Sequence, residues 1–340
     1  MGHFPRPWKR SKLVLLNKPG KDTSDPRAYR PICLLSTMRK VLDKLVSQLI
    51  LHHYHSNNLL NPFQHGFRAS KSRETAGFEL REVVPEKVGQ NQGVCMVSLD
   101  VAGAFDNACW ESILYLLGEV ACPLNIFRLV RSYLRNRWVC YETQATRVEH
   151  EVKRGYPQGS CSGPLFWNIV ADSLLNQRFP ENTYVQAYAD DLVLVIWGHN
   201  ESQIGDQGRA AMSIIEEWGE LNKLRVSPQM SYRLRLSLAN LPVVYLYGQP
   251  IRAVGELKYL GVIWDEGLTF HAHFKDRKVA IDSLSYRLAL TVCKWYSNQP
   301  CLLKKIHKGA LETKALYGHG AWGHRLNLKT FCELFTTFDW

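Results

Sequence analysis

Hydrophobic residues in this chain follow two spacings, and the change from one to the other predicts where strands and helices lie. Residues 93–100, GVCMVSLD, form an almost unbroken apolar run, which predicts a buried strand that ends on a carboxylate. Residues 13–16 predict a short strand before a Lys-Pro-Gly-Lys turn, in an otherwise irregular and basic N-terminal stretch. Residues 137–152 predict a polar hairpin, and residues 183–189 and 192–197 predict the two strands of another.

Other segments carry helical spacing. Ser36 or Thr37 is expected to cap one helix, and Asp106 or Asn107 another that ends near Gly118. A glycine-, proline- and serine-rich loop (GYPQGSCSGP) leads into a further, apolar helix. Apolar faces are predicted at Leu42, Leu45 and Leu49; at Met212, Ile215, Trp218 and Leu221; and at Ile281, Leu284, Leu288, Val292 and Trp295. Helices and strands mix without strict alternation, which favours an α+β fold.

Composition narrows the class of protein. The chain has 340 residues, which predicts one large lobed unit or two to three subdomains. With 42 Lys and Arg against 31 Asp and Glu, its net charge is +11. This excess favours a polyanionic partner, nucleic acid first, although many basic proteins bind no polyanion. The nine cysteines contain no C-x-x-C pair, which fits a reducing compartment. No apolar run reaches the roughly 18 residues that a membrane-spanning helix needs.

The stretch QAYADDLVLVI carries two adjacent carboxylates, Asp190 and Asp191, inside a pattern typical of buried strands. Adjacent carboxylates repel each other, and an apolar setting makes both harder to ionise. A hairpin turn would explain a single Asp. For two, a bound divalent cation is the simpler explanation, because hard cations take carboxylate oxygens and cancel the repulsion. With Asp100 at the end of another strand, three carboxylates are available to hold two Mg²⁺ ions.

Blocks of the sequence, taken together and in order, resemble one family. They are LLNKPGKDTSDPRAYRPICLLS (15–36), NPFQHGFRASKSRETA (61–76), SLDVAGAFD (98–106), GYPQGSCSGPLFWNIVADSLL (155–175), YADD (188–191) and KYLGVIWD (258–265). They resemble the reverse transcriptases of non-LTR (LINE-type) retrotransposons, the polymerase core of the Pol polyprotein. The resemblance implies a right-hand polymerase with fingers, a palm with an antiparallel sheet and a catalytic hairpin, and a helical thumb. It implies fingers and palm at residues 8–275 and a thumb-like helical region at residues 276–340.

The resemblance also implies roles for individual residues. The metal ligands would be Asp100, Asp190, Asp191 and the carbonyl of Val101, with two Mg²⁺ as cofactors and Mn²⁺ as an alternative. The nucleotide would contact Lys18, Arg30, Val101, Phe105, Gln158 and Gly159. The template and primer would contact Gln64, Gly66, Phe67, Arg68 and Tyr188. Phe105 would exclude the ribose 2′-hydroxyl and so select deoxynucleotides, whereas without the resemblance it reads as a core residue. Isolated from the motifs, Lys18 and Arg30 would be solvated surface charges.

The implied activity is RNA-directed DNA polymerisation with dNTPs, an RNA template and a DNA primer, inside the cell and in the nucleus. One departure stands against it, because Met230 occupies the position where the family carries a lysine that is thought to protonate the departing pyrophosphate. The alternative is therefore a catalytically decayed remnant that still binds nucleic acid. An RNA-dependent RNA polymerase is disfavoured, since Phe105 would obstruct ribonucleotides.

Overall fold

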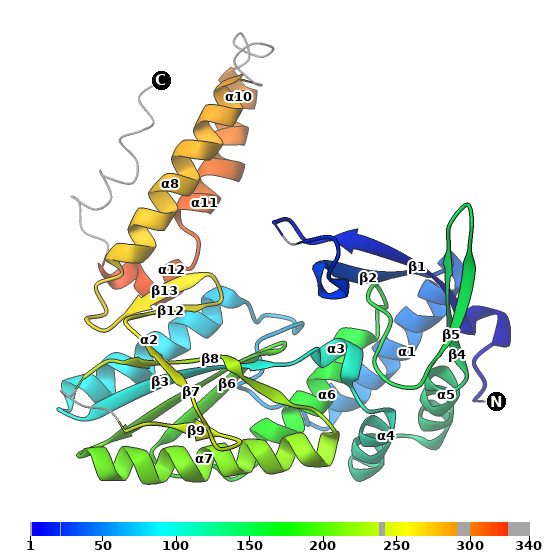
Figure 1. Cartoon of the computed structure of the whole chain (residues 1–340), viewed down its shortest axis with the longest axis horizontal. Coiled ribbons are helices and arrows are strands. Elements are labelled where there is room, and N and C mark those ends of the chain that lie inside the picture. Colours follow the sequence, from blue (N-terminus) through cyan, green and yellow to red (C-terminus); the bar gives the residue numbers. More distant parts are fainter. Residues whose placement is uncertain (1, 21, 238–241, 291–299, 326–340) are drawn as a thin grey trace. The chain divides into compact units, whose positions relative to one another are not determined.

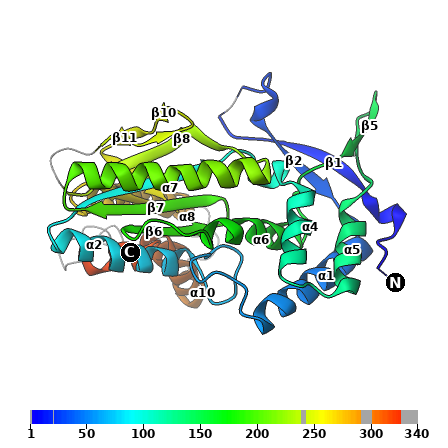
Figure 2. The same cartoon turned by 90° about the horizontal axis from the view of Figure 1, so that it is seen from below.

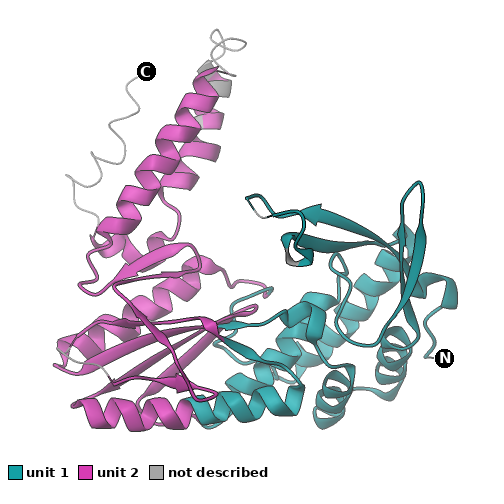
Figure 3. Ribbon diagram, viewed as in Figure 1, with its two compact units in different colours: residues 1–67, 100–178, 212–227 teal, residues 68–99, 179–211, 228–340 magenta. Residues whose placement is uncertain are grey.

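The computed structural model of the chain describes residues 2–20, 22–237, 242–290 and 300–325. The chain divides into two compact units, and neither is one continuous stretch (Figure 3). Unit 1 comprises residues 1–67, 100–178 and 212–227, and unit 2 comprises residues 68–99, 179–211 and 228–340. The division expected at residues 275 and 276 falls inside unit 2 and stays a prediction. None of the described helices is long and apolar enough to cross a membrane.

Unit 1 contains a four-stranded sheet in the order β2-β1-β4-β5 (Figure 1). Its strands are β1 (Arg10–Asn17), β2 (Tyr29–Leu34), β4 (Arg137–Glu142) and β5 (Arg147–Val152). The strand predicted at residues 13–16 and the hairpin at 137–152 are confirmed. β2 was not predicted. It is held by its antiparallel register with β1, from Lys12↔Leu34 to Asn17↔Tyr29, and its own short pattern gives little sign of that partner.

Helices form the rest of unit 1. They are α1 (Thr37–Ser56), α3 (Ala104–Asn107), α4 (Trp110–Glu119), α5 (Leu124–Leu134) and α6 (Gly163–Leu175). Ser36 caps α1 as predicted, because its hydroxyl accepts a hydrogen bond from the Arg39 backbone N–H. The cap predicted at Asp106 or Asn107 is wrong. Both residues lie inside the one-turn α3, and α4 starts after Cys109 without a side-chain cap.

The buried face of α1 also differs from the prediction. Leu45 and Leu49 are 51% and 47% exposed, so they do not form the core face. The buried positions of α1 are Arg39, Asp43, Val46, Ile50 and Tyr54. The carboxylate of Asp43 explains the rotation, because it accepts hydrogen bonds from the Cys161 backbone N–H and the Ser162 hydroxyl. A buried carboxylate must keep its hydrogen-bond partners, so Asp43 determines which face of α1 packs against the core, even though the apolar spacing predicts another face.

Unit 2 is built on a five-stranded sheet in the order β11-β8-β3-β7-β6. These strands are β3 (Gly93–Val101), β6 (Thr183–Tyr188), β7 (Asp191–Gly198), β8 (Val226–Arg235) and β11 (Arg252–Val254). The predicted buried strand is β3, and the predicted hairpin is the antiparallel pair β6 and β7. The last two residues of β3 and the first two of β8 belong to unit 1. Two short strands, β9 (Tyr245–Leu246) and β10 (Gln249–Pro250), pair beside this sheet.

Helices pack against both sides of β7. Leu80 and Val84 of α2 (Arg73–Gly89) share a core cluster with Val193 and Val195. On the alternate face, Ile196 lies beside Gly208 of α7 (Glu201–Asn222), a helix that runs along β7 in Figure 2. Both faces are therefore buried, as an unbroken apolar run predicts. The predicted stripe of α7 is confirmed at Met212, Ile215 and Trp218, whereas Leu221 is 79% exposed.

The remaining elements of unit 2 are a hairpin and a set of helices. They are β12 (Glu256–Tyr259), β13 (Val262–Asp265), α8 (His271–Leu288), α10 (Pro300–Ile306), α11 (Thr313–Ala315) and α12 (His319–Trp322). Ile281 of α8 is buried with Leu311 and Ala315, and Leu284 and Leu288 pack against that cluster as predicted. Val292 and Trp295 lie outside the described residues.

His273 lies fully buried at the base of α8. Its Nε2 lies 3.3 Å from the carbonyl oxygen of Tyr317, so the neutral ring donates to that carbonyl. Its ring centre lies 5.9 Å from that of the buried Trp322. The pKa of His273 is lowered to about 4, mainly by burial and in smaller part by the nearby charge of Arg277, while the hydrogen bond to Tyr317 acts the other way.

The first prediction follows from this lowered pKa. In the unfolded chain the histidine takes up a proton near its usual pKa of about 6.5, while the folded state resists it, so acid favours unfolding. Stability should fall as pH drops from 6.5 towards 4, by up to about 3 kcal/mol, since each pKa unit is worth about 1.4 kcal/mol. The non-titrating His273→Gln should lose most of this pH dependence in urea unfolding. His271→Gln, at an exposed position of the same helix, should retain it; equal pH profiles for the two variants would contradict the assignment.

The second prediction concerns Asp43. Asp43→Ala leaves the Ser162 hydroxyl and the Cys161 N–H without their acceptor and removes a charge near the buried Arg39. Breaking such a buried charged network costs about 3–5 kcal/mol of unfolding free energy. The exposed neighbour Lys44→Ala should change stability by less than about 0.5 kcal/mol. A similar, small effect for both variants in urea unfolding would show that the network does not stabilise unit 1.

Candidate active site

The loop at residues 155–159 is fixed to α3 and to β2 by backbone hydrogen bonds. The N–H of Tyr156 donates to the carbonyl of Phe105 at 2.9 Å, and the N–H of Gly155 donates to the carbonyl of Ala108 at 2.8 Å. From the other side, the N–H of Cys33 donates to the carbonyl of Gln158 at 3.0 Å. Three sequence blocks that are far apart along the chain are thus held together within unit 1.

Gly155 is required for this arrangement. Its φ is +73°, and a Cβ at this position would lie 2.3 Å from the backbone oxygen of Asp106. No real Cβ tolerates that distance, and L-residues rarely adopt that φ. Gly159, also at positive φ, leaves its backbone open towards solvent.

Phe105 lies half-buried in a cluster of aromatic rings. Its ring centre lies 5.8 Å from that of Trp167, 6.5 Å from that of Tyr156 and 6.2 Å from that of Phe67. Trp167 and Tyr156 are buried, whereas Phe67 is 58% exposed. The buried rings of Trp167 and Tyr156 thus pack against the inner side of Phe105. Its outer side reaches the surface beside Phe67, which is predicted to contact the template. The packing role and the sugar-selecting role are compatible at this position.

Asp106 holds the side chain of Gln158. The amide Nε2 of Gln158 donates to both carboxylate oxygens of Asp106, at 3.3 and 3.4 Å. Protein atoms crowding the carboxyl group raise the pKa of Asp106, while the Gln158 hydrogen bond and the charge of Lys18 act in the opposite direction. Because Nε2 faces the carboxylate, the orientation of the amide is set. Asp106 ends the Ala-Phe-Asp motif, and its position in the sequence indicates only a helix cap.

The two predicted triphosphate cations lie in the same unit. Lys18 follows β1, where its backbone N–H donates to the carbonyl of Ala28 at 2.7 Å, and its charge acts on Asp106. Arg30 lies in β2 opposite Leu16, with its side chain exposed. An exposed guanidinium on a paired strand can meet an anion in solution without a large desolvation cost.

The predicted template residues form one loop that α6 supports. Asn168 of α6 donates from its side-chain Nδ2 to the carbonyl of Gly66 at 2.9 Å. Gln64 is fully buried, and its Oε1 accepts a hydrogen bond from the Gly66 N–H, which gives it a role inside the loop. Phe67, at a φ of +55°, and the partly exposed Arg68 reach the surface. These two are therefore the members of the set best placed to meet a strand.

The aspartate pair sits at the turn of the β6–β7 hairpin. Tyr188 pairs with Asp191, so Ala189 and Asp190 form a two-residue connection, and Ala189 takes a φ of +57°. A non-glycine residue at positive φ in a tight hairpin is uncommon. The guanidinium of Arg73 lies 5.6 Å from the centre of the Tyr188 ring. Asp190 is half-buried and Asp191 is exposed.

The third predicted ligand, Asp100, is next to last in β3, and β3 neighbours β7 in the sheet. Asp100 belongs to unit 1, and Asp190 and Asp191 belong to unit 2. In the part of the chain that the structure describes, no three His, Cys, Asp or Glu side chains are grouped so that they could hold a metal ion. The donors themselves are hard carboxylate oxygens, which suit Mg²⁺. Met230 lies in β8 and is 57% exposed.

Comparison with known proteins agrees with this arrangement. The profile of the family described as "Reverse transcriptase (RNA-dependent DNA polymerase)" matches residues 16–264. A 115 kDa protein of the type-1 retrotransposable element R1DM of Drosophila melanogaster is 31% identical over 95% of this chain and 31% of its own length. The Pol polyprotein of element R1 of Bradysia coprophila is 31% identical over 94% of this chain and 32% of its own length. The RNA-directed DNA polymerase of the mobile element jockey of Drosophila funebris is 26% identical over 92% and 34%. The chain spans about a third of the length of these relatives.

Solved structures show the same fold at low identity. Telomerase from Candida tropicalis, in complex with a fragment of telomeric RNA, covers 97% of this chain with a TM-score of 0.56 and 10% identity. Telomerase from Candida albicans covers 99% with a TM-score of 0.53 and 13% identity. The predicted right-hand polymerase fold is confirmed. The order of the motifs and the fixed loop around Phe105 and Gln158 agree with the family match over residues 16–264. The chain therefore belongs to the reverse transcriptase (RNA-dependent DNA polymerase) family.

Proposed function

We propose that this chain is the RNA-directed DNA polymerase of a non-LTR retrotransposon, which adds dNTPs to the 3′-hydroxyl of a primer on an RNA template. The observation that carries the proposal is the assembly of Phe105, Gln158 and Asp106 by the loop at residues 155–159. The jockey and R1 relatives support the reaction class. The net charge of +11 suits the phosphates of a template and primer.

In this proposal Asp100, Asp190, Asp191 and the Val101 carbonyl hold two Mg²⁺ ions, or Mn²⁺ in their place. Bound divalent metal would lower the pKa of the primer hydroxyl and stabilise the charge on the departing pyrophosphate. The chemistry of the donors supports it, since hard divalent cations take carboxylate and carbonyl oxygens. The carboxylates supply negative charge, and the hairpin turn presents two of them at adjacent positions.

The remaining residues of the set would bind and orient the substrates. Lys18 and Arg30 would hold the triphosphate, the first as a point charge and the second as a fork of donors. The Gln158 amide, fixed through Nε2 by Asp106, would turn its Oε1 acceptor and the Gly159 backbone towards the nucleotide. Phe105 would stack under the deoxyribose, and Phe67, Arg68 and Tyr188 would contact the strands.

A second candidate function is a nucleic-acid-binding remnant without polymerase activity. Met230 favours it, because a thioether cannot donate a proton to pyrophosphate and this side chain is exposed on β8. The two candidates share the basic surface and the fold. They differ only in the chemical step, which experiment can separate.

The third prediction tests that step. The wild-type chain should extend a DNA primer on an RNA template with dNTPs and Mg²⁺. Asp190→Asn removes a proposed metal ligand, so its rate should fall by more than the roughly 10–100-fold that loss of an outer-shell partner of a metal ligand costs. Binding of primer–template by Asp190→Asn should stay equal or tighten, since one negative charge is lost. Asp206→Asn, on the exposed side of α7, is the matched control and should keep full activity. If the wild-type chain binds primer–template but never extends it, the remnant is the correct function.

The fourth prediction concerns the choice of sugar. Phe105→Ala removes the ring proposed to meet a 2′-hydroxyl. The preference for a dNTP over the matching rNTP should therefore fall by about tenfold or more, a typical size for one steric contact. The measurement is the ratio of kcat/KM for a dNTP and the matching rNTP. This ratio is insensitive to lost packing against Trp167, because both substrates use the same protein. An unchanged ratio would leave Phe105 with a packing role alone.

A further inference from the structure

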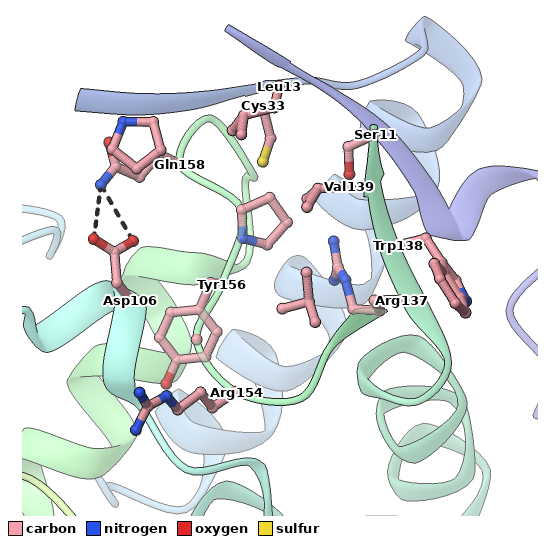
Figure 4. A pocket seen from close by; sticks show the side chains of 14 residues that line it. Ser11, Leu13, Cys33, Asp106, Arg137, Trp138, Val139, Arg154, Tyr156 and Gln158 are labelled. Atoms are coloured by element: carbon pink, nitrogen blue, oxygen red, sulfur yellow. Dashed lines mark hydrogen bonds between the residues drawn. The ribbon is translucent and has the colours of Figure 1, made fainter. Parts of the chain in front are cut away.

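A cavity of about 350 Å³ lies inside unit 1, between the sheet and the fixed loop (Figure 4). Its walls come from β1 and β2, from the start of β4 and the end of β5, and from residues 154–158. Much of the lining is apolar, including Leu13, Trp138 and Val139. A space of this size with a few polar groups is typical of a small-molecule site.

Arg137, the first residue of β4, is the main polar group of the wall. It is only 3% exposed, and its guanidinium lies over the Tyr133 ring at 4.6 Å from the ring centre. Both terminal nitrogens, Nη1 and Nη2, are buried and donate no hydrogen bond to any of the described residues. In Figure 4 the guanidinium rises from β4 towards Ser11 and the interior of the cavity. The Tyr133 ring contacts the flat face of the guanidinium, whereas the N–H donors of Arg137 point outwards in the plane of the group, so this contact does not satisfy them.

The surrounding residues do not supply an acceptor for this charge. Arg39, 1% exposed, donates to the hydroxyl of Ser11 at 3.1 Å, yet its own Nε and Nη2 have no partner among the described residues. The buried Asp43 accepts from Ser162 and Cys161. Of the cavity-lining residues only Asp106 is acidic, and its carboxylate accepts from Gln158. Burying a guanidinium with unpaired donors is unfavourable, so a bound anion that accepts from these nitrogens would offset that penalty.

The cavity is not the proposed triphosphate position. In the β1–β2 pair, Leu13 lies opposite Cys33, and both line the cavity. Arg30 and Ile32 alternate with Pro31 and Cys33 along β2, so they point to the other face of the sheet. The side chains of Arg30, the predicted triphosphate cation, and Cys33, which lines the cavity, therefore lie on opposite faces of β2.

We propose that this cavity is a second anion site, which binds a small phosphate-type oxyanion through the guanidinium of Arg137. A tetrahedral oxyanion can accept from both terminal nitrogens of Arg137 at once, the geometry for which arginine is suited. The apolar lining at Leu13, Trp138 and Val139 leaves room for an organic group, so a phosphate monoester fits as well as free phosphate. Gln158 lines the cavity and also belongs to the proposed nucleotide site. An anion bound in the cavity would therefore make the loop at residues 155–159 more rigid on the side that faces away from the nucleotide.

The test is binding of two probes, inorganic phosphate and phenyl phosphate, to the whole chain without nucleic acid, at constant ionic strength in chloride. Calorimetry and Tm are read in a Lys18→Ala, Arg30→Ala background, which removes the two proposed triphosphate cations; Arg154, which also lines the cavity, is kept in every variant. Each probe should bind with one-site stoichiometry and raise Tm by several degrees at saturation, as a ligand of the folded state does. Tighter binding of phenyl phosphate would identify a monoester, and equal binding would identify free phosphate.

Arg137→Leu, added to that background, should remove the binding and the Tm shift of both probes. In phosphate-free buffer it should leave Tm unchanged or higher, because it deletes an unpaired buried charge. Arg135→Leu, an exposed neighbour with the same loss of charge, should bind both probes as before. If Arg137→Leu does not fold, Arg137→Lys keeps the charge and should bind at least about tenfold more weakly, since the fork of donors is lost. Binding that survives either Arg137 variant, or no binding to the background chain, would overturn the proposal.

Discussion

Two backbone hydrogen bonds around one glycine support the part of the candidate active site that lies in unit 1. Because Gly155 has no Cβ, residues 155 and 156 can lie directly on α3 and form hydrogen bonds to the carbonyls of Ala108 and Phe105. The same loop is also bonded to β2, because the N–H of Cys33 donates to the carbonyl of Gln158. Any side chain at Gly155 would push the loop away from Asp106, and the orientation of the Gln158 amide would be lost with it.

The loop also depends on polar groups buried beneath it. Asp43 holds the backbone of Cys161 and the hydroxyl of Ser162, which are the last residues before α6. The Ser162 hydroxyl in turn lies 3.2 Å from the hydroxyl of Tyr133, over which Arg137 stacks. Low local dielectric makes such networks strong when satisfied and costly when not. The buried donors of Arg137 and Arg39 that lack a partner among the described residues are therefore costly.

Local patterns gave the strands and motifs but not the long-range polar contacts. The apolar run at 93–100 and the Tyr-Ala-Asp-Asp turn are readable because strand burial and tight turns leave their signal in neighbouring residues. The buried face of α1 was misassigned because Arg39 and Asp43 are typical surface residues, and their partners lie more than 100 residues away or in another element. Asp106 was misassigned for the same reason. β2 was missed because its pairing with β1 decides its conformation.

Hydrogen exchange of single backbone amides tests the central claim, that the loop is held against α3 and β2 in the free protein. The amides of Cys33, Gly155 and Tyr156 should exchange as slowly as that of Phe166 in the buried helix α6, because all four donate to backbone carbonyls within unit 1. The amide of Gln144, at the exposed tip of the β4–β5 hairpin, gives the fast reference. If Gly155 and Tyr156 exchange as fast as Gln144 while Phe166 stays protected, the loop is not fixed and the account of the site is wrong.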